Sequence, residues 1–186
     1  NKEIEGWSSD IRPDFGTNGT DASIYEIHVR DMTIDPDSGV TKEKRGTFAG
    51  LAEKGTSYTK GDVTVSTGLD HIKELGVNAV QILPFFDQYN NELEDRFNWG
   101  YNPQNYNVLE GQYSTDPYNA ETRIKEFKQM VQAYHDANIE IVMDVVYNHM
   151  SGICGSSFHK ILPGYFFRYD KSGKAYNGSG CGNDVA

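Results

Sequence analysis

The fold of this chain is decided by the stretch Ile139-Glu-Ile-Val-Met-Asp-Val-Val-Tyr-Asn-His149. Residues 139–146 are largely apolar on both faces of an extended chain. This is typical of a strand inside a parallel sheet, because such strands are covered on both sides. Asp144 brings a charge into this run just before the expected loop. We therefore predict a buried parallel strand over residues 139–146 that opens into a polar loop.

Two earlier segments predict strands of the same sheet. Apolar residues alternate with polar ones over residues 24–32, and an apolar run covers residues 77–83 before Pro84. Apolar residues recur at helical spacing between the predicted strands. The first such segment covers residues 69–75, and the second runs from Asn119 to a left-handed stop at Asn138. The order strand, helix, strand, helix, strand predicts a parallel sheet joined by right-handed crossovers.

Long connections follow the predicted strands. Residues 35–65 form a polar connection with a short helical turn near residues 48–53, and residues 85–118 form an aromatic loop with almost no periodicity. Residues 147–186 continue without a second clear helix. Loops after the strands are where α/β barrels and doubly wound sheets place their active sites. Residues 1–23 are polar and predict a linker or a lead-in from a preceding domain.

Length and composition limit the classes of protein. The chain has 186 residues, enough for one domain but fewer than the roughly 250 of a complete eight-stranded α/β barrel. Its net charge of −10 disfavours nucleic acid and anionic membranes as partners. The 12 Tyr and 9 Phe often lie in polar stretches, which suits stacking against sugar rings but also half-buried loop packing.

The strand end at residues 144–149 carries the strongest chemical signal. Alternation places Asp144 and Asn148 on one face, and a buried carboxylate there needs a partner that the sequence does not reveal. Two interpretations stay open, a functional site at the strand end or a loop that Asp144 and His149 merely fix by hydrogen bonds. The His and Cys residues lack the spacing of a zinc site, and pairing of Cys154 with Cys181 cannot be decided.

Four segments resemble one family in the correct order. Asp144-Val-Val-Tyr-Asn-His149 matches the first conserved motif of the α-amylase superfamily, glycoside hydrolase family thirteen, and Tyr25-Glu-Ile-His-Val-Arg-Asp31 resembles its first barrel strand. Asn98-Trp-Gly-Tyr-Asn-Pro103, followed by Tyr113-Ser-Thr-Asp-Pro117, resembles a segment typical of type I pullulanases. Asn177-Gly-Ser-Gly-Cys-Gly-Asn183 is similar to the pullulanase loop after the third strand.

This resemblance implies a fold and an activity. Residues 24–186 are expected to form strands 1 to 3 of a partial (β/α)8 TIM barrel with long βα loops, with the remaining barrel strands of the same protein as their partner. The implied reaction is retaining hydrolysis of α-1,6-glucosidic bonds in a branched α-glucan such as pullulan, glycogen or limit dextrins. The nucleophile and the acid/base carboxylate follow later strands in the family, so no catalytic residue is expected in this chain.

The resemblance also implies roles for single residues. His149 contacts the sugar at the cleavage point, and the Tyr101 ring stacks on the same sugar. Asp144 supports the site through an Arg near the nucleophile, and Asn148 shapes the adjoining loop. No cofactor or metal is expected to be required, and a need for calcium stays open. Acids of the second long loop are assigned to a solvated rim: Asp87, Glu92, Glu94 and Asp95.

Three alternatives remain at this stage. The first is another hydrolase of the superfamily, either an isoamylase or an α-1,4-amylase. The second is a noncatalytic α-glucan-binding protein, which becomes the better hypothesis if the 186 residues are a complete gene product. The third is an unrelated α/β domain whose motif matches are coincidental. The compartment, extracellular or cytoplasmic, is left open.

Overall fold

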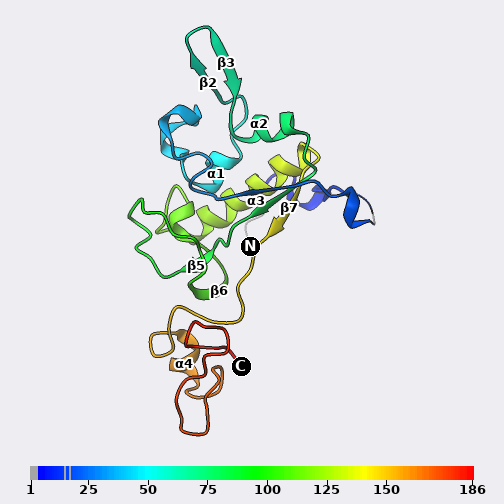
Figure 1. Ribbon diagram of the computed structural model, residues 1–186. Coiled ribbons are helices and arrows are strands. Elements are labelled where there is room, and N and C mark those ends of the chain that lie inside the picture. The colour runs from blue at the N-terminus through cyan, green and yellow to red at the C-terminus, as the bar shows by residue number, and fades with distance from the viewer. Residues whose placement is uncertain (1–3, 15, 17) are drawn as a thin grey trace.

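The computed structural model describes residues 4–14, 16 and 18–186. Its centre is a parallel sheet of three strands in the order β1-β4-β7 (Figure 1). The strands are β1 (Ile24–Ile27), β4 (Ala79–Ile82) and β7 (Glu140–Met143). The parallel sheet predicted from the sequence is confirmed, with the second strand in the middle.

Each strand is shorter than the prediction. The ladder between β4 and β7 ends at the pair Ile82 and Met143, and one further hydrogen bond runs from Asp144 N to Ile82 O at 3.0 Å. Asp144 and the residues after it have therefore left the sheet, so strand alternation does not place Asn148. The apolar side chains beyond the ladder misled the prediction, because loop residues such as Val29 and Val146 are also buried.

Three helices confirm the predicted pattern. They are α1 (Phe48–Leu51), α2 (Gly68–Leu75) and α3 (Ala120–Asp136). Gly76 ends α2 with a φ of 72°, a left-handed conformation that costs glycine little. The Asn119 side chain accepts hydrogen bonds from the first free N–H groups of α3, and Asn138 follows that helix with a φ of 59°.

The sheet has one face packed against helices and one face that stays partly open. Val80 and Ile82 are fully buried in a core with residues of α1 and α3, among them Phe48 and Tyr134. The opposite face carries Glu26, Gln81 and Val142 in register, of which Glu26 is exposed and the other two are half-buried. Gln81 Nε2 donates to Glu26 Oε1 across this face at 3.0 Å.

Two hairpins correct the predicted long loops. Residues 35–65 contain most of an antiparallel hairpin of β2 (Ser57–Lys60) and β3 (Val63–Ser66), closed by a two-residue turn with Gly61 at a φ of 60°. Residues 85–118 contain β5 (Phe86–Gln88) paired with β6 (Pro103–Leu109). Register shifts interrupt this second ladder, so no period of two is visible in the sequence.

The C-terminal segment, residues 150–186, lies beyond the sheet's carboxyl edge (Figure 1, orange to red). It contains one short helix, α4 (Ser157–Ile161), which the sequence pattern did not predict. Ser156 caps this helix by accepting from His159 N. The segment packs on β6, where Ser157 Oγ donates to Asn105 Oδ1 at 3.0 Å.

The described part of residues 1–23 packs along α3. His135 Nδ1 lies 2.6 Å from Asp10 Oδ2, and the Lys128 ammonium lies 4.9 Å from the centre of the Trp7 ring. Five short 3₁₀ turns complete the described elements: η1 (Trp7–Ser9), η2 (Gly19–Asp21), η3 (Pro36–Ser38), η4 (Lys42–Lys44) and η5 (Gly111–Tyr113). None of the helices described combines the length and the apolar character that a bilayer span requires.

Candidate functional site

Tyr101 and Asp144 meet at the carboxyl edge of the sheet. Asp144 directly follows β7, and Tyr101 lies on the loop that joins β5 to β6. The Tyr101 hydroxyl donates to Asp144 Oδ2 at 2.6 Å, which supplies the partner that the sequence did not reveal. This hydrogen bond, helped by burial, raises the pKa of Tyr101 to about 12. Tyr101 is therefore protonated at neutral pH and can donate this hydrogen bond.

His149 lies against the backbone of Tyr101. Its Nε2 is 2.8 Å from the Tyr101 carbonyl oxygen, and its Nδ1 is 3.0 Å from Asn148 Oδ1. A carbonyl oxygen can only accept, so Nε2 carries a proton. A neutral ring then requires the Asn148 amide to turn its nitrogen toward Nδ1, whereas a protonated ring donates to Oδ1.

The structure thus brings together the four residues singled out from the sequence. Tyr101, Asp144, Asn148 and His149 form one hydrogen-bonded cluster, although they come from two different loops. The Tyr101 residue is 39% exposed, so part of its ring surface is open to a ligand. Tyr106 also holds the backbone of this cluster, because its hydroxyl donates to the His149 carbonyl oxygen at 2.5 Å.

The glycine-rich segment 177–183 is folded back beside Asn148. Val185 N donates to Asn148 O at 3.0 Å, and Asp184 forms an isolated bridge with His149. The hydroxyl of Ser179 and nearby backbone N–H groups lower the pKa of Asp184, so it stays ionised. These contacts line a cavity of about 480 Å³ next to Asn148, with Arg168 and Tyr176 on its walls.

His28 is a site residue that the sequence reasoning did not single out. It follows β1, is 7% exposed, and its Nε2 lies 2.9 Å from Asn98 O and 3.1 Å from the Tyr113 hydroxyl. Its ring also packs 5.0 Å from that of Phe97. The signal was present, because His28 directly follows the first strand, where active-site loops begin.

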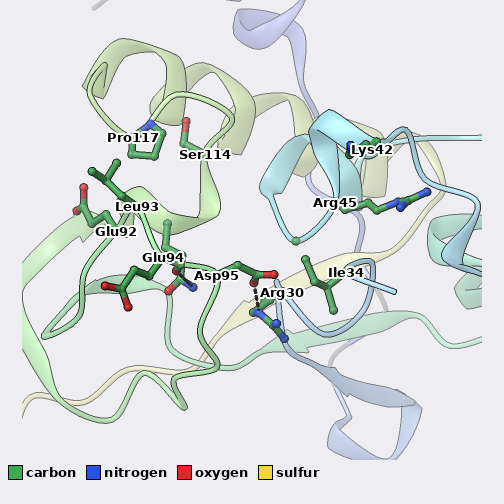
Figure 2. A pocket seen from close by; sticks show the side chains of 12 residues that line it. Arg30, Ile34, Lys42, Arg45, Glu92, Leu93, Glu94, Asp95, Ser114 and Pro117 are labelled. Carbon is green, nitrogen blue, oxygen red and sulfur yellow. Dashed lines mark hydrogen bonds and ion pairs between the residues drawn. The ribbon is translucent and has the colours of Figure 1, made fainter. Parts of the chain in front are cut away.

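Arg30 ties the β1 loop to the aromatic loop. Its Nε donates to Asp95 Oδ1 at 2.5 Å and its Nη1 to Asp31 Oδ1 at 2.9 Å. Figure 2 shows Arg30 and Asp95 joined directly to each other in the wall of a pocket. The volume of this pocket is about 500 Å³. Lys42 and Arg45 lie on the basic side of this pocket, and the acidic side belongs to the aromatic loop.

The prediction of a solvated acidic rim is right for Asp95, only partly right for Glu94, whose side chain is 41% exposed, and wrong for Asp87 and Glu92. The Asp95 side chain is 62% exposed. Asp87 and Glu92 are half-buried, because Asn105 donates to Asp87 at 2.5 Å and Arg123 pairs with Glu92 at 3.4 Å. The antiparallel pairing of β5 with β6 places Asp87 opposite Asn105, and Glu92 is held from the loop by Arg123 of α3.

Glu110 is the most buried acid of this region. It has no exposed surface, and its carboxylate accepts from Gln88 N, Gln112 N and Asn90 Nδ2 at 2.9, 2.8 and 3.1 Å. Burial nevertheless raises the pKa of Glu110 to about 7, and the hydrogen bonds only moderate this rise.

Glu110, Asp87 and Glu92 offer carboxylate oxygens that all lie within 4.8 Å of one another. They are the one group with metal-ligand spacing among the described residues, and oxygen ligands of this kind suit a hard cation such as Ca²⁺. Cys154 and Cys181 are both exposed free thiols. The thiols therefore belong to no disulfide and to no group of this kind.

The loops at the carboxyl edge of this parallel sheet carry exposed aromatic rings, amides and a histidine. This arrangement is typical of α/β domains that bind a polar ligand at that edge. The family described as "Alpha amylase, catalytic domain" matches residues 20–161. The chain belongs to this family.

Two pullulanases show how the chain relates to solved and curated proteins. It is 39% identical to the pullulanase of Bacillus subtilis (strain 168) over 183 residues, which is 97% of this chain and 24% of that protein. The crystal structure of pullulanase from Paenibacillus barengoltzii complexed with maltohexaose and alpha-cyclodextrin matches with a TM-score of 0.91 and 45% identity, covering 98% of this chain and 28% of that one. The chain therefore spans about a quarter of the length of the pullulanases that it matches.

A plant enzyme with a different name is also similar. The chain is 34% identical to isoamylase 3, chloroplastic, from Oryza sativa subsp. japonica over 180 residues, which is 89% of this chain and 21% of that protein. Both kinds of relative are thus similar to this chain, and the pullulanases from Bacillus subtilis and Paenibacillus barengoltzii are more similar to it than isoamylase 3 is.

Proposed function

We propose that residues 24–186 are the first part of a (β/α)8 catalytic barrel, with β1, β4 and β7 as its strands 1 to 3 and residues 1–23 as the lead-in. The parallel order supports this, since each strand is followed by a long loop. The partly open face of Glu26, Gln81 and Val142 suits a barrel interior, which only the remaining strands would cover. Those strands are the proposed intramolecular partner.

We further propose that the full-length protein hydrolyses α-1,6-glucosidic bonds of a branched α-glucan such as pullulan, glycogen or limit dextrins. One observation carries this proposal, namely the cluster in which Tyr101, Asp144 and His149 hydrogen-bond at the carboxyl edge of the sheet. The pullulanase from Paenibacillus barengoltzii, similar over almost all of this chain, was crystallised with maltohexaose. No nucleic acid or membrane partner is proposed for an acidic chain of this charge.

Each residue of the cluster has a proposed role in binding the sugar. The ring of Tyr101 provides an apolar platform for one face of a glucose unit. His149 Nε2–H, which donates to the Tyr101 carbonyl here, provides a donor for a sugar oxygen. Asp144 positions the platform through the Tyr101 hydroxyl, and Asn148 fixes the orientation of the His149 ring.

The cleavage itself is proposed to be a retaining double displacement by two carboxylates that lie outside this chain. Three of the described acids are engaged by other side chains. Asp144 is engaged by the Tyr101 hydroxyl, while Asp87 and Glu92 are held by Asn105 and Arg123. The proposed role of the described residues is therefore binding and positioning, and the catalytic residues are proposed to lie in the rest of the full-length protein.

The reaction is proposed to need no cofactor. The carboxylate group of Asp87, Glu92 and Glu110 shares no residue with the cluster of Tyr101, Asp144, Asn148 and His149, so none of the proposed contacts with the sugar involves a cation there. Hydrolysis should therefore survive treatment of the full-length protein with EDTA. Loss of turnover that Ca²⁺ restores would contradict this.

The function is tested by comparing pullulan with linear amylose as substrates of the full-length protein. We expect hydrolysis of pullulan and little of amylose, and a sharp loss of turnover in His149→Ala with an unchanged melting temperature. His71→Ala on α2 is the matched control, because His71 lies on the helical side of the sheet. Preference for amylose would indicate an α-1,4-amylase, and binding without turnover would indicate a noncatalytic glucan-binding protein.

The similarity to isoamylase 3 keeps a second debranching specificity under test. Glycogen should then be compared with pullulan at equal concentrations of α-1,6 branch points. A protein that debranches glycogen but leaves pullulan intact would favour the isoamylase alternative.

A further inference from the structure

The backbone around His149 is paired with a short segment that contains Asp184. The two residues form an isolated antiparallel bridge, and Val185 N donates to Asn148 O at 3.0 Å. Next to this bridge, Asn183 Nδ2 donates to the carbonyl oxygen of the residue that follows His149. Asp184 is only 6% exposed, so water competes little for its hydrogen bonds. These contacts lie entirely within the described chain, and they hold the backbone that carries the His149 ring.

The side chain of Asp184 is bound by the glycine-rich segment. Its Oδ2 accepts from Gly178 N at 2.7 Å, and its Oδ1 accepts from Ser179 N at 3.1 Å and from the Ser179 hydroxyl. A Cβ at position 178 would lie 2.9 Å from Asp184 Oδ2, so glycine there permits this close approach. Hydrogen bonds to an ionised carboxylate are among the stronger ones in proteins. Asp184 therefore anchors the glycine-rich segment and the backbone of His149 to each other.

Asp170 shows the same chemistry without a link to the site. Its Oδ1 accepts from Ser172 N at 2.8 Å, from Ser172 Oγ at 2.6 Å and from Lys174 N at 3.0 Å. It closes a turn of the same C-terminal segment, but among the described contacts no hydrogen bond joins it to residues 148–150. The bridge to the site thus distinguishes Asp184 from an acid that only closes a turn.

The position of the His149 ring depends on the backbone that Asp184 holds. The ring Nε2 donates to the Tyr101 carbonyl oxygen at 2.8 Å, and the proposed contact with a sugar uses the same N–H. The Tyr106 hydroxyl also holds this backbone, because it donates to the His149 carbonyl oxygen at 2.5 Å. Hydrogen bonds weaken when the donor is displaced or turned. A shift of the backbone at His149 therefore weakens the bond that its ring offers, even where the ring itself is unchanged.

We propose that Asp184 is a positioning residue of the glucan site, which acts through the backbone of His149 and directs the His149 Nε2–H toward the sugar. This inference rests on the proposed function, since it assigns a support to the same site. The role requires no contact between Asp184 and the sugar. It requires the negative charge, because the carboxylate accepts all three bonds from Gly178 and Ser179.

The test begins with Asp184→Asn in the full-length protein. We expect kcat/KM for pullulan to fall by about tenfold, as for the loss of a hydrogen bond to a charged group. Asp184→Glu keeps the charge and should recover part of this loss. Asp170→Asn is the matched control and should leave kcat/KM unchanged. Equal values in Asp184→Asn and Asp170→Asn would overturn the proposal.

A double-mutant cycle separates positioning of His149 from a general effect on the fold. In a His149→Ala background, Asp184→Asn should lower kcat/KM by much less than tenfold, because the group through which it acts is absent. The same fold loss in both backgrounds would overturn the proposal. Ser179→Ala removes only one of the donors to Asp184 and takes its place in the cycle if the melting temperature shows that Asp184→Asn does not fold.

A parent protein that hydrolyses no α-glucan would contradict the proposed function instead. The positioning of His149 is then decided by NMR of the full-length protein with labelled histidine. The ring signals of His149 should move in Asp184→Asn or Ser179→Ala and stay in place in Asp170→Asn. Signals that stay in place in all of these variants would overturn the role of Asp184.

Discussion

The Tyr101 hydroxyl donates to Asp144 Oδ2 over 2.6 Å and so joins the β5–β6 loop to the end of β7. The residues are 43 positions apart in the sequence. A hydrogen bond to a carboxylate is among the stronger ones in proteins, which suits a contact that must hold an aromatic platform. The orientation of the Tyr101 ring therefore depends on Asp144, and four substitutions at these two positions distinguish the ring from its support.

Tyr101→Phe keeps the ring and removes the hydroxyl. We expect kcat/KM for pullulan to fall by about tenfold, as for the loss of one hydrogen bond to a charged group. Tyr101→Ala removes the platform as well and should cost clearly more. Equal activities of the parent and Tyr101→Phe would show that the Asp144 contact does not position the ring.

Asp144→Asn keeps an acceptor oxygen for the Tyr101 hydroxyl but removes the charge. Its kcat/KM should lie between that of the parent and that of Asp144→Ala, which leaves the hydroxyl without this acceptor. The pKa of Tyr101, now raised to about 12, should move back toward its ordinary value in Asp144→Asn. NMR titration of labelled tyrosine measures that change, and a pKa that stays at about 12 would contradict the assigned cause.

Much of the frame was predictable because local patterns encode it. Gly76 and Asn119 marked helix ends by their backbone and capping chemistry, and the apolar run before Asp144 marked a buried strand. The resemblance of the motifs, and no physical pattern, singled out Tyr101. The partner of Asp144 was not predictable, because a contact between two loops depends on the whole fold. Glu110 was missed for a related reason, since its burial arises from the irregular pairing of β5 with β6.

Glu110 predicts a pH dependence of stability. Burial raises its folded-state pKa from 4.5 to about 7, so the folded protein keeps a proton that the unfolded chain has released between these values. The stability from this group is fully present below pH 4.5 and is lost as pH rises through about 7, amounting to about 3 kcal/mol. The melting temperature of the full-length protein should fall accordingly between pH 5 and 8.

Glu110→Gln is the matched variant for this test. The glutamine amide has a single oxygen, whereas both Glu110 oxygens accept hydrogen bonds. The free energy of unfolding of the variant should therefore be lower than that of the parent at pH 5. Its melting temperature should nevertheless depend less on pH between 5 and 8. A slope as steep as that of the parent would assign the pH effect to other groups.

The ion pair between Arg30 and Asp95 is expected to order the loop between β5 and β6. Asp95→Asn weakens a contact of 2.5 Å whose acidic partner is 62% exposed, so the loss of stability should be small, about 0.5 to 1 kcal/mol. An effect of similar size on function is expected, because the loop carries Tyr101. We expect KM for pullulan to rise about threefold and to become less sensitive to salt. Lys54→Gln is the control, since Lys54 pairs with Asp136 on the outer surface at 57% and 68% exposure.

The sheet edges predict the behaviour of the 186-residue chain when it is expressed alone. In the described sheet β1 and β7 each have one neighbour, and Ile24 of β1 is 53% exposed. Unpaired strand edges next to apolar side chains favour association with other chains. We expect the isolated chain to self-associate in light scattering and to unfold without a sharp transition. A monodisperse monomer that unfolds cooperatively would mean that these edges need no further strands, and the proposed barrel partner would lose its physical basis.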